Sequence, residues 1–291
     1  RVHDIDPARH VLTAAGGALP CTSPAAAATG CALLIVAVVD AAQTEAVLFG
    51  PQGAAAALPP GATVLLCPTI GPADVERLAA RLQAAGLACL DAPMSGGPAR
   101  ARDGSMSLMV AGVPLDSAAW AAWQPLLRHL AARLFHIGPR PGDGARTKLV
   151  NNLLAAINLA GAAEALALAQ QLGLDGAATL AVVAESSGHS WIGADRLPRA
   201  LAGDFAPRAH TTLLAKDSAL AMAMAAQAGL QPPLGRLAAA QFQAALAAGH
   251  GGQDDARMLS LLQAQFAAAV AAGAGAQAQA GAAEESPDAP G

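Results

Sequence analysis

The chain has 291 residues, of which 54% are hydrophobic and only 3% aromatic, and its formal net charge is −4. This length allows one large domain or two ordinary ones, and the charge, with no cluster of Lys and Arg, argues against general nucleic-acid binding. No uncharged run has the density of bulky apolar residues that a membrane span needs, and no leader segment is recognisable, so a cytoplasmic location is expected.

Strand-like and helical segments alternate over the first half of the chain. Apolar runs predict strands at 31–39, 63–67, 87–92, 106–110 and 134–137, and the opening residues 1–4 resemble the end of a further strand. Helices are expected at 41–48, 72–85 and 115–133, and Pro7 is well placed to begin another. This alternation predicts an α/β fold with a doubly wound, mainly parallel sheet.

The second half shows no strand pattern. Helices are expected at 147–172, 177–185, 211–228, 234–248 and 254–272. We therefore divide the chain into an α/β domain at 1–141 and an all-helical domain at 142–272. Residues 273–291 lack bulky apolar side chains and are expected to be a disordered tail.

The rarest polar residues are concentrated in one segment, G-D-G-A-R-T-K-L-V-N-N (142–152). The chain has two lysines, Lys148 and Lys216, and its three asparagines are Asn151, Asn152 and Asn158. On a helix Lys148, Asn151 and Asn152 would share a face. The simpler interpretation is a polar patch on an amphipathic helix, but a lysine amine can exchange a proton where an arginine cannot. We therefore interpret Lys148 as a candidate catalytic residue.

Further candidate residues follow the ends of the predicted strands. Ser95-Gly96-Gly97 follows one strand, where two glycines can form an anion-binding turn or simply an ordinary one. Asp4 follows the opening segment and could bind a ribose or cap a helix, a role for which Asp6 is equally suited. Val38, Val39 and Thr69 end two other strands, where backbone and hydroxyl groups would face a cofactor.

Other polar residues are open to simpler interpretations. Lys216 and Asp217 could form a solvated charge pair. His189 and His210 have no expected ligand partner, and the four cysteines show no C-x-x-C spacing, so neither a metal site nor a disulfide framework is expected.

Three motifs resemble, in order and spacing, those of the β-hydroxyacid dehydrogenases. They are D-A-P-M-S-G-G (91–97), G-D-G-A-R-T-K-L-V-N-N (142–152) and A-K-D-S-A-L-A (215–221). The resemblance covers roughly residues 2–265 and extends to relatives of 3-hydroxyisobutyrate dehydrogenase, tartronate semialdehyde reductase and 6-phosphogluconate dehydrogenase. It implies a Rossmann domain joined by a long helix to an all-α domain that forms a homodimer or homotetramer.

The resemblance assigns a role to each matching residue. Lys148 matches the general acid and base, Asn152 matches a substrate-binding asparagine, and Ser95, Gly96 and Gly97 match the loop that binds the substrate carboxylate. The positions that match cofactor contacts are Asp4, Val38, Val39, Gln43, Thr69 and Lys216, and the acid at Asp4 favours NAD over NADP. The stretches 39–50 and 187–191 look most like L-threonate dehydrogenase, so the expected substrates are short hydroxy acids of these kinds.

One departure concerns the start of the family's pattern. The strand and G-x-G-x-x-G loop that bind the cofactor pyrophosphate have no counterpart here, and ~20 or more residues would have to precede Arg1 to supply them. We expect an N-terminally truncated sequence whose residues 1–291 bind NAD poorly. The alternatives are an imine reductase, whose usual lack of the lysine argues against it, and a non-catalytic remnant.

Overall fold

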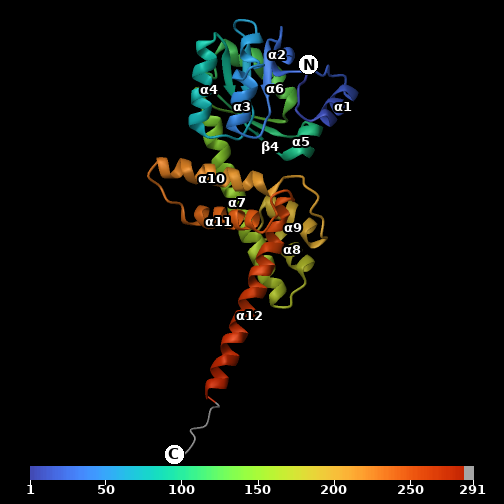
Figure 1. Cartoon of the computed structure of the whole chain (residues 1–291), viewed down its shortest axis with the longest axis vertical. Helices are drawn as coiled ribbons and strands as arrows, with labels where there is room; N and C mark the ends of the chain where they lie inside the picture. Colours follow the sequence, from blue (N-terminus) through green and yellow to red (C-terminus); the bar gives the residue numbers. More distant parts are fainter. Residues whose placement is uncertain (285–291) are drawn as a thin grey trace, which may run out of the picture. The chain divides into compact units, whose positions relative to one another are not determined.

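The computed structural model describes the backbone of residues 1–284 and the side chains through Gly273. The chain forms two compact units, Arg1–Asn151 and a second that begins at Asn152. Both are drawn in Figure 1 and are described separately below.

A mixed β-sheet forms the centre of the first unit. Within the described residues its six strands are β1 (Leu33–Val36), β2 (Thr63–Leu66), β3 (Ala88–Asp91), β4 (Met94–Ser95), β5 (Ser107–Ala111) and β6 (Arg133–Gly138). Strands β1, β2 and β3 run parallel, with Leu33 opposite Thr63 and Thr63 opposite Ala88. Strand β5 is antiparallel to β3 and β4 and parallel to β6. The expected Rossmann-type sheet is therefore confirmed, with two strands, β5 and β6, that run opposite to β1, β2 and β3.

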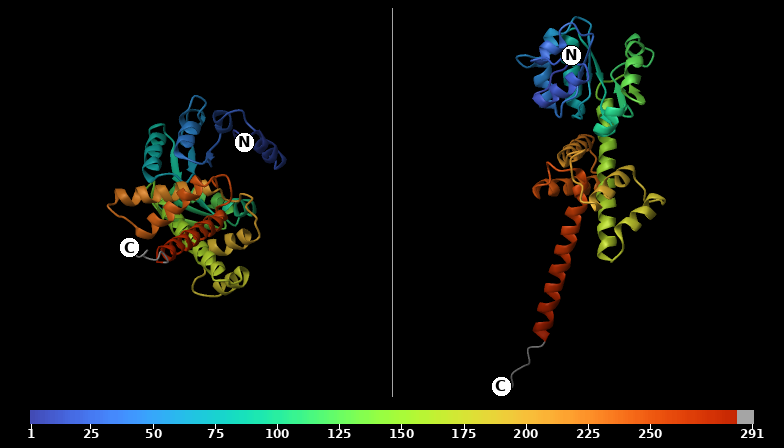
Figure 2. Two further views of the ribbon diagram at one scale, coloured as in Figure 1. Left: turned by 60° about the horizontal axis from the view of Figure 1, so that its bottom comes forward. Right: turned by 90° about the vertical axis from the view of Figure 1, so that its right-hand side faces the viewer.

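Helices cover both faces of this sheet. The helices of the first unit are α1 (Pro7–Ala15), α2 (Pro24–Ala28), α3 (Ala41–Phe49), α4 (Pro72–Ala84), α5 (Gly97–Asp103) and α6 (Ala118–Leu130), with a short 3-10 turn at Ala55–Ala57. Helices α1 and α5 contain no buried residue, so α2, α3, α4 and α6 provide the covering side chains. Because strand side chains alternate between faces, Val64 and Leu66 pack with the α3 and α4 side chains, whereas Leu65 packs with Trp120 and Leu127 of α6. In Figure 2 the green α6 accordingly lies on the opposite side of the sheet from the blue helices.

The opening segment differs from its expected form. Val2 makes only an isolated parallel bridge to Pro20, so residues 1–4 do not form a strand of the sheet. Asp6 caps α1 by accepting a hydrogen bond from the Ala8 N–H. A single bridge gives too few ladder hydrogen bonds to hold a strand, and β1 pairs only with β2.

The second unit is built from helices. After α7 (Asp143–Gln171), which begins in the first unit, come α8 (Gly176–Ala184), α9 (Trp191–Leu201), α10 (Thr211–Gln227), α11 (Pro233–Ala247) and α12 (Met258–Glu284), with a 3-10 turn at Asp255–Arg257. Helix α9 has no counterpart among the expected helices. Its Pro198 and a glycine at position 193 obscure the helical signal, but Ile192, Leu197 and Ala200 are buried in the core.

Helix α7 supplies much of that core. By length and composition it is the one helix among the described residues that could cross a membrane, yet Ala156, Leu159, Ala163 and Leu166 pack inside the second unit. Its apolar side chains therefore have a packing role in the fold.

Two boundaries differ from the expected ones. The compact units divide between Asn151 and Asn152, inside α7, whereas the sequence pattern placed the boundary at 141/142, before the helix begins. Helix α12 runs to Glu284, so the backbone at 273–284 is helical where a disordered tail was expected. Alanine is the strongest helix former, which explains the extension. The rest of the expected tail, residues 285–291, lies outside the described residues.

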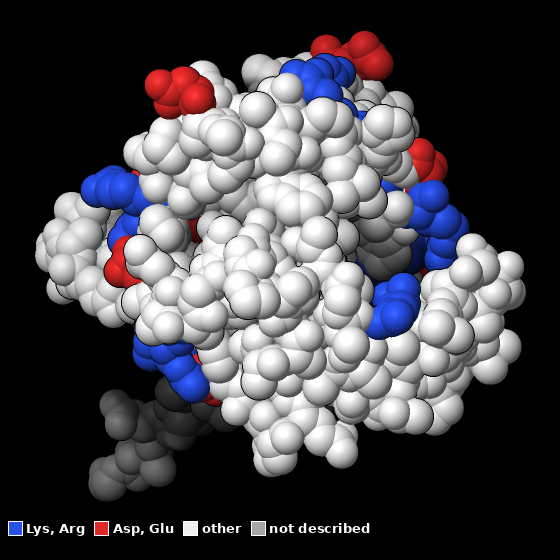
Figure 3. Space-filling model, turned by 90° about the horizontal axis from the view of Figure 1, so that it is seen from above, with Lys and Arg blue, Asp and Glu red and all other residues white. Residues whose placement is uncertain are grey.

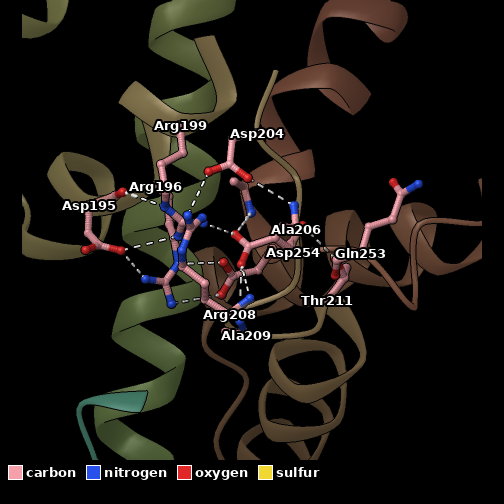
Figure 4. A network of polar contacts seen from close by, with 12 residues as sticks. Asp195, Arg196, Arg199, Asp204, Ala206, Arg208, Ala209, Thr211, Gln253 and Asp254 are labelled. Carbon is pink, nitrogen blue, oxygen red and sulfur yellow. Dashed lines mark hydrogen bonds and ion pairs between the residues drawn. The ribbon is translucent and has the colours of Figure 1, made fainter. Parts of the chain in front are cut away.

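A buried ionic network ties α9 to the segments around it (Figure 4). Asp254 is fully buried and accepts hydrogen bonds from the N–H groups of Arg208 (2.8 Å), Ala209 (3.1 Å) and Ala256 (3.1 Å). Arg199 lies 3.1 Å from the same carboxylate, and Arg196 donates to Asp255 over 2.6 Å. Burial raises the pKa of Asp255 to about 6, while the Arg196 charge opposes that rise. These contacts hold the loop before α10 against the start of α12.

Candidate active site

Lys148 and Asn152 lie on successive turns of α7. Their side chains are 7% and 9% exposed, and a spacing of four residues places them on one face of the continuous helix. Asn151, expected on the same face, is exposed, and Asn158 is half-buried. Of the three residues grouped by spacing, the structure therefore buries two. A buried lysine is costly without a partner, and Lys148 is not without one.

The Ser95–Gly97 loop lies between the sheet and α5. Gly96 and Gly97 have φ values of 129° and 67°, which residues with a Cβ rarely adopt. A Cβ at Gly96 would lie 2.8 Å from the Arg100 side chain. Ser95 is half-buried and pairs with Ser107 of β5. The two glycines thus allow the positive φ values of this loop, and the absence of a Cβ at Gly96 leaves room for the Arg100 side chain.

The expected cofactor positions follow neighbouring parallel strands. Val38 and Val39 come after β1, and Thr69 comes after β2, so these residues lie at the carboxyl edge of the parallel part of the sheet. Gln43 accepts a hydrogen bond from the Val39 N–H over 3.0 Å, and the Val39 side chain is 50% exposed. Asp40 caps α3 through the Gln43 N–H at 2.8 Å. The carboxyl edge of a doubly wound sheet is where such folds bind their ligands.

Asp4 has a different setting from the one expected. It does not end a strand, and its Oδ1 accepts a hydrogen bond from the Asp6 N–H over 2.9 Å. Its own N–H donates to His10 Nε2 over 3.0 Å. The structure therefore gives Asp4 a turn-forming contact, and a ribose-binding role for it remains a prediction.

Asp217 is a buried carboxylate of the second unit for which the sequence suggested no role in the site. It contacts both Asn152 and Lys216. Asp217 is 5% exposed; its Oδ2 accepts a hydrogen bond from Asn152 Nδ2 over 2.6 Å, and its Oδ1 accepts one from Lys216 Nζ over 2.7 Å. The charge pair considered for Lys216 and Asp217 is present, but it is not a solvated pair, because Asp217 is buried. The sequence did contain a signal for this burial: most residues around Asp217 in α10 are apolar, as expected for a helix packed inside the protein.

Asp91 is the second buried carboxylate that the sequence did not single out. It ends β3 and is 1% exposed, and its Oδ2 accepts hydrogen bonds from the N–H groups of Gly142 (2.9 Å) and Ala145 (3.0 Å) at the start of α7. Burial raises its pKa to about 6, against the lowering effect of these backbone hydrogen bonds. Asp91 thus joins the first motif to the second.

The histidines and cysteines considered in the sequence show no sign of a metal site or a disulfide among the described residues. No group of His, Cys, Asp and Glu among the described residues could hold a metal ion. His210 Nδ1 lies 3.1 Å from the Gly252 carbonyl oxygen, a backbone contact. The cysteines that the structure describes are all free. The face in Figure 3 is mostly uncharged, with Lys and Arg in small separate groups beside Asp and Glu.

Fold and site together define a class of protein: an α/β dinucleotide-binding domain, followed by a helical domain, with a buried lysine on the helix that begins the second motif. Residues 1–138 match the NAD-binding domain of 6-phosphogluconate dehydrogenase, and residues 142–262 match the NAD-binding family of NADP-dependent 3-hydroxyisobutyrate dehydrogenase. The class is that of nicotinamide-dependent oxidoreductases.

Individual relatives show to which family of these oxidoreductases the chain belongs. An L-threonate dehydrogenase of Cupriavidus necator is 38% identical over 262 residues, which cover 89% of this chain and 87% of that protein. The crystal structure of a 3-hydroxyisobutyrate dehydrogenase from Salmonella typhimurium aligns with a TM-score of 0.82 at 34% identity, covering 89% and 90% of the two chains. Psf3, solved in complex with NADP+, aligns with a TM-score of 0.81 at 27% identity, covering 90% and 91%. The chain belongs to the β-hydroxyacid dehydrogenase family.

Proposed function

We propose that this protein is an NAD-dependent dehydrogenase of a short hydroxy acid, with Lys148 as the general acid and base. The expected substrates are acids of the L-threonate, 3-hydroxyisobutyrate or tartronate semialdehyde type. The observation that carries the proposal is the burial of Lys148 next to Asn152 on α7, in a chain with only two lysines.

Lys148 would move the proton of the reacting hydroxyl. In oxidation its amine accepts the hydroxyl proton, and in reduction its ammonium returns a proton to the carbonyl oxygen. Low exposure brings the amine into contact with a bound substrate, and the proton taken up in each oxidation is released to solvent before the next turnover. When bound, the nicotinamide supplies the hydride exchange that balances this proton transfer.

Substrate binding is assigned to Ser95, Gly96, Gly97 and Asn152. The Gly96 and Gly97 backbone has the conformation in which successive N–H groups can bind a carboxylate. Asn152 is held by Asp217, so its amide oxygen is oriented before the substrate arrives. Such preorganisation reduces the conformational entropy lost when the substrate binds.

Cofactor binding is assigned to Asp4, Val38, Val39, Gln43, Thr69 and Lys216. The carboxyl edge formed after β1 and β2 supports this assignment, since ligands of such sheets bind there. NAD is favoured over NADP through Asp4, because an acid repels the extra phosphate of NADP.

The assembly that we propose is a homodimer or homotetramer through the helical domain. Leu168, Leu172, Leu234 and Leu237 of the second unit are each more than half exposed. These exposed leucines are the residues that we assign to this interface, since contiguous apolar surface marks sites of association. Free cysteines fit a reducing, cytoplasmic location.

A substrate screen tests the function. The protein is expressed from its complete natural reading frame, and reduction of NAD and of NADP is followed by the absorbance of the reduced nicotinamide, with C3–C4 hydroxy acids as substrates. We expect turnover with at least one such acid and a preference for NAD. Imine reduction without turnover of any hydroxy acid would instead support the imine reductase alternative, and no cofactor binding at all would support a remnant.

A further inference from the structure

The start of α7 is attached to the sheet by one buried side chain. Asp91 Oδ2 accepts hydrogen bonds from the N–H groups of both Gly142 and Ala145, and its side chain is 1% exposed. The donors lie 51 and 54 residues away in sequence. The carboxylate satisfies N–H groups that every helix leaves unpaired at its first turn.

The two glycines of G-D-G make this attachment possible. Gly142 has a φ of 91°, and a Cβ there would lie 3.2 Å from the Pro72 carbonyl oxygen. A Cβ at Gly144 would lie 2.8 Å from the Met109 carbonyl oxygen and 2.9 Å from Asp91 Oδ2. Only a backbone without side chains can approach β3 and β5 this closely. The motif therefore supplies the close contact that Asp91 needs.

Other contacts at the start of α7 lie nearer the solvent. Asp143 pairs with Arg140 and Arg146, and Arg146 also contacts Glu76. Arg140 is 78% exposed, and Arg146 and Glu76 are 42% and 47% exposed. Exposed ion pairs of this kind constrain a helix weakly. Asp143 itself is 16% exposed and Asp91 is 1% exposed, so Asp91 is the most deeply buried of these polar contacts at the first turn.

The same carboxylate lies at the start of the substrate loop. Ser95 follows Asp91 by four residues, and Lys148 follows Ala145 by three, about one helical turn. A shift of the first turn along β3 would move the Lys148 amine relative to the Ser95–Gly97 loop. All these residues belong to the first unit.

We propose that Asp91 is a positioning residue for the hydroxy-acid dehydrogenase reaction, in which its carboxylate sets the placement of Lys148 relative to the substrate loop. This inference rests on the proposed function. Asp91 contacts the backbone of α7 and acts through Lys148.

The test combines hydrogen exchange with steady-state kinetics on the enzyme expressed from its complete reading frame. Asp91→Ala removes both hydrogen bonds, and Asp91→Asn keeps a side-chain oxygen of the same shape. Leu82→Ala removes a fully buried leucine of the first unit and controls for general loss of stability. Asp175→Ala removes the capping carboxylate of α8 and controls for loss of a helix cap elsewhere.

We expect Asp91→Ala to speed amide exchange over residues 142–148 by ~10-fold or more. Its kcat should fall ~10–100-fold while the KM for NAD changes little, because a displaced general base slows the reaction without removing cofactor contacts. Asp91→Asn should have an amide exchange rate at 142–148 and a kcat that are both close to those of the wild type. Leu82→Ala and Asp175→Ala should keep wild-type kcat per folded molecule.

Three results would overturn the inference. Asp91→Ala could keep wild-type exchange at 142–148, or wild-type kcat per folded molecule. If Asp91→Ala does not fold, Asp91→Asn decides: a large loss of kcat with wild-type exchange would assign its effect to charge and not to position. A wild-type enzyme that turns over no hydroxy acid would instead overturn the proposed function, and the exchange data would still report on the contact with α7.

Discussion

Asn152 donates a hydrogen bond from Nδ2 to Asp217 Oδ2 over 2.6 Å, and both side chains are buried. The other oxygen of this carboxylate accepts a hydrogen bond from Lys216 over 2.7 Å. One carboxylate therefore orients an amide assigned to the substrate and a lysine assigned to the cofactor. Because Asp217 is buried, its hydrogen bonds are more rigid and stronger than those of an exposed pair.

Asp217→Asn should lower kcat/KM by ~10–100-fold, because the loss of a hydrogen bond to a charged group is worth about 1.5–3 kcal/mol. Both oxygens of Asp217 accept hydrogen bonds, but the asparagine side chain has one NH2 group in place of an oxygen. That group would face either Lys216 Nζ or Asn152 Nδ2, each of which is a donor. Steady-state kinetics with the best hydroxy acid measure the effect. Asp204→Asn is the matched control, since Asp204 makes an exposed ion pair with Arg208 in the same unit; equal effects of the two changes would contradict the prediction.

Lys148→Met should lower kcat by at least ~100-fold, the usual contribution of a general acid or base. Methionine is close to lysine in length and tolerates burial, so the fold should be retained. NADH binding, followed by fluorescence titration, should change little. Arg140→Met, a change at a side chain that is 78% exposed, serves as the control. Turnover by Lys148→Met at the wild-type rate would remove Lys148 from the mechanism.

Gly144→Ala should lower the free energy of unfolding by about 1–3 kcal/mol, because the new methyl group would meet backbone and carboxylate oxygens under 3 Å away. Gly161→Ala is the control on the same helix, since nothing lies within 4 Å of a Cβ built there. It should stabilise the protein by ~0.5–1 kcal/mol through helix propensity. Urea unfolding of both variants gives the comparison, and opposite signs are expected.

Asp254→Ala should destabilise the protein by about 3–5 kcal/mol, because it leaves Arg199 and three backbone N–H groups without their buried acceptor. Asp195, which also pairs with Arg196 and Arg199 but is 42% exposed, provides the contrast. Asp195→Ala should cost only ~0–1 kcal/mol. Denaturant midpoints for the two variants measure the difference; similar losses would show that burial of the network contributes little.

The pH dependence of stability should report on Asp91. Its pKa is raised by burial from 3.8 to about 6, so the folded state holds the proton more tightly than the unfolded chain. The resulting stabilisation is fully present below pH 3.8 and is lost as the pH rises through about 6. The Asp91→Asn variant has no titratable group at this position, so it serves as the reference for the pH dependence.

The wild-type free energy of unfolding, relative to that of Asp91→Asn, should therefore fall by about 3 kcal/mol between about pH 4 and pH 7. Asp255 also titrates near 6, but it is present in both proteins and cancels in the difference. Urea unfolding at the two pH values measures the change. A constant difference between the two proteins would show that the pKa of Asp91 is not raised.

The sequence alone determined the division into an α/β half and a helical half, and most of the strands and helices within them. It also identified Lys148, Asn152 and the Ser95–Gly97 loop as candidates. These features depend on local properties: the period of apolar residues, the φ freedom of glycine and the scarcity of lysine and asparagine. Local signals failed where α9 contains Pro198 and where alanine extends α12.

The tertiary structure alone decided which polar residues are buried and what they bind. Asp91 reaches Gly142 across 51 residues, and Asn152 reaches Asp217 across 65. Asp217 resembled half of a surface charge pair, and Asp91 resembled an ordinary strand end. Their roles follow from burial, because a carboxylate without solvent must find its hydrogen-bond donors within the fold, and the chain's packing alone determines which donors those are.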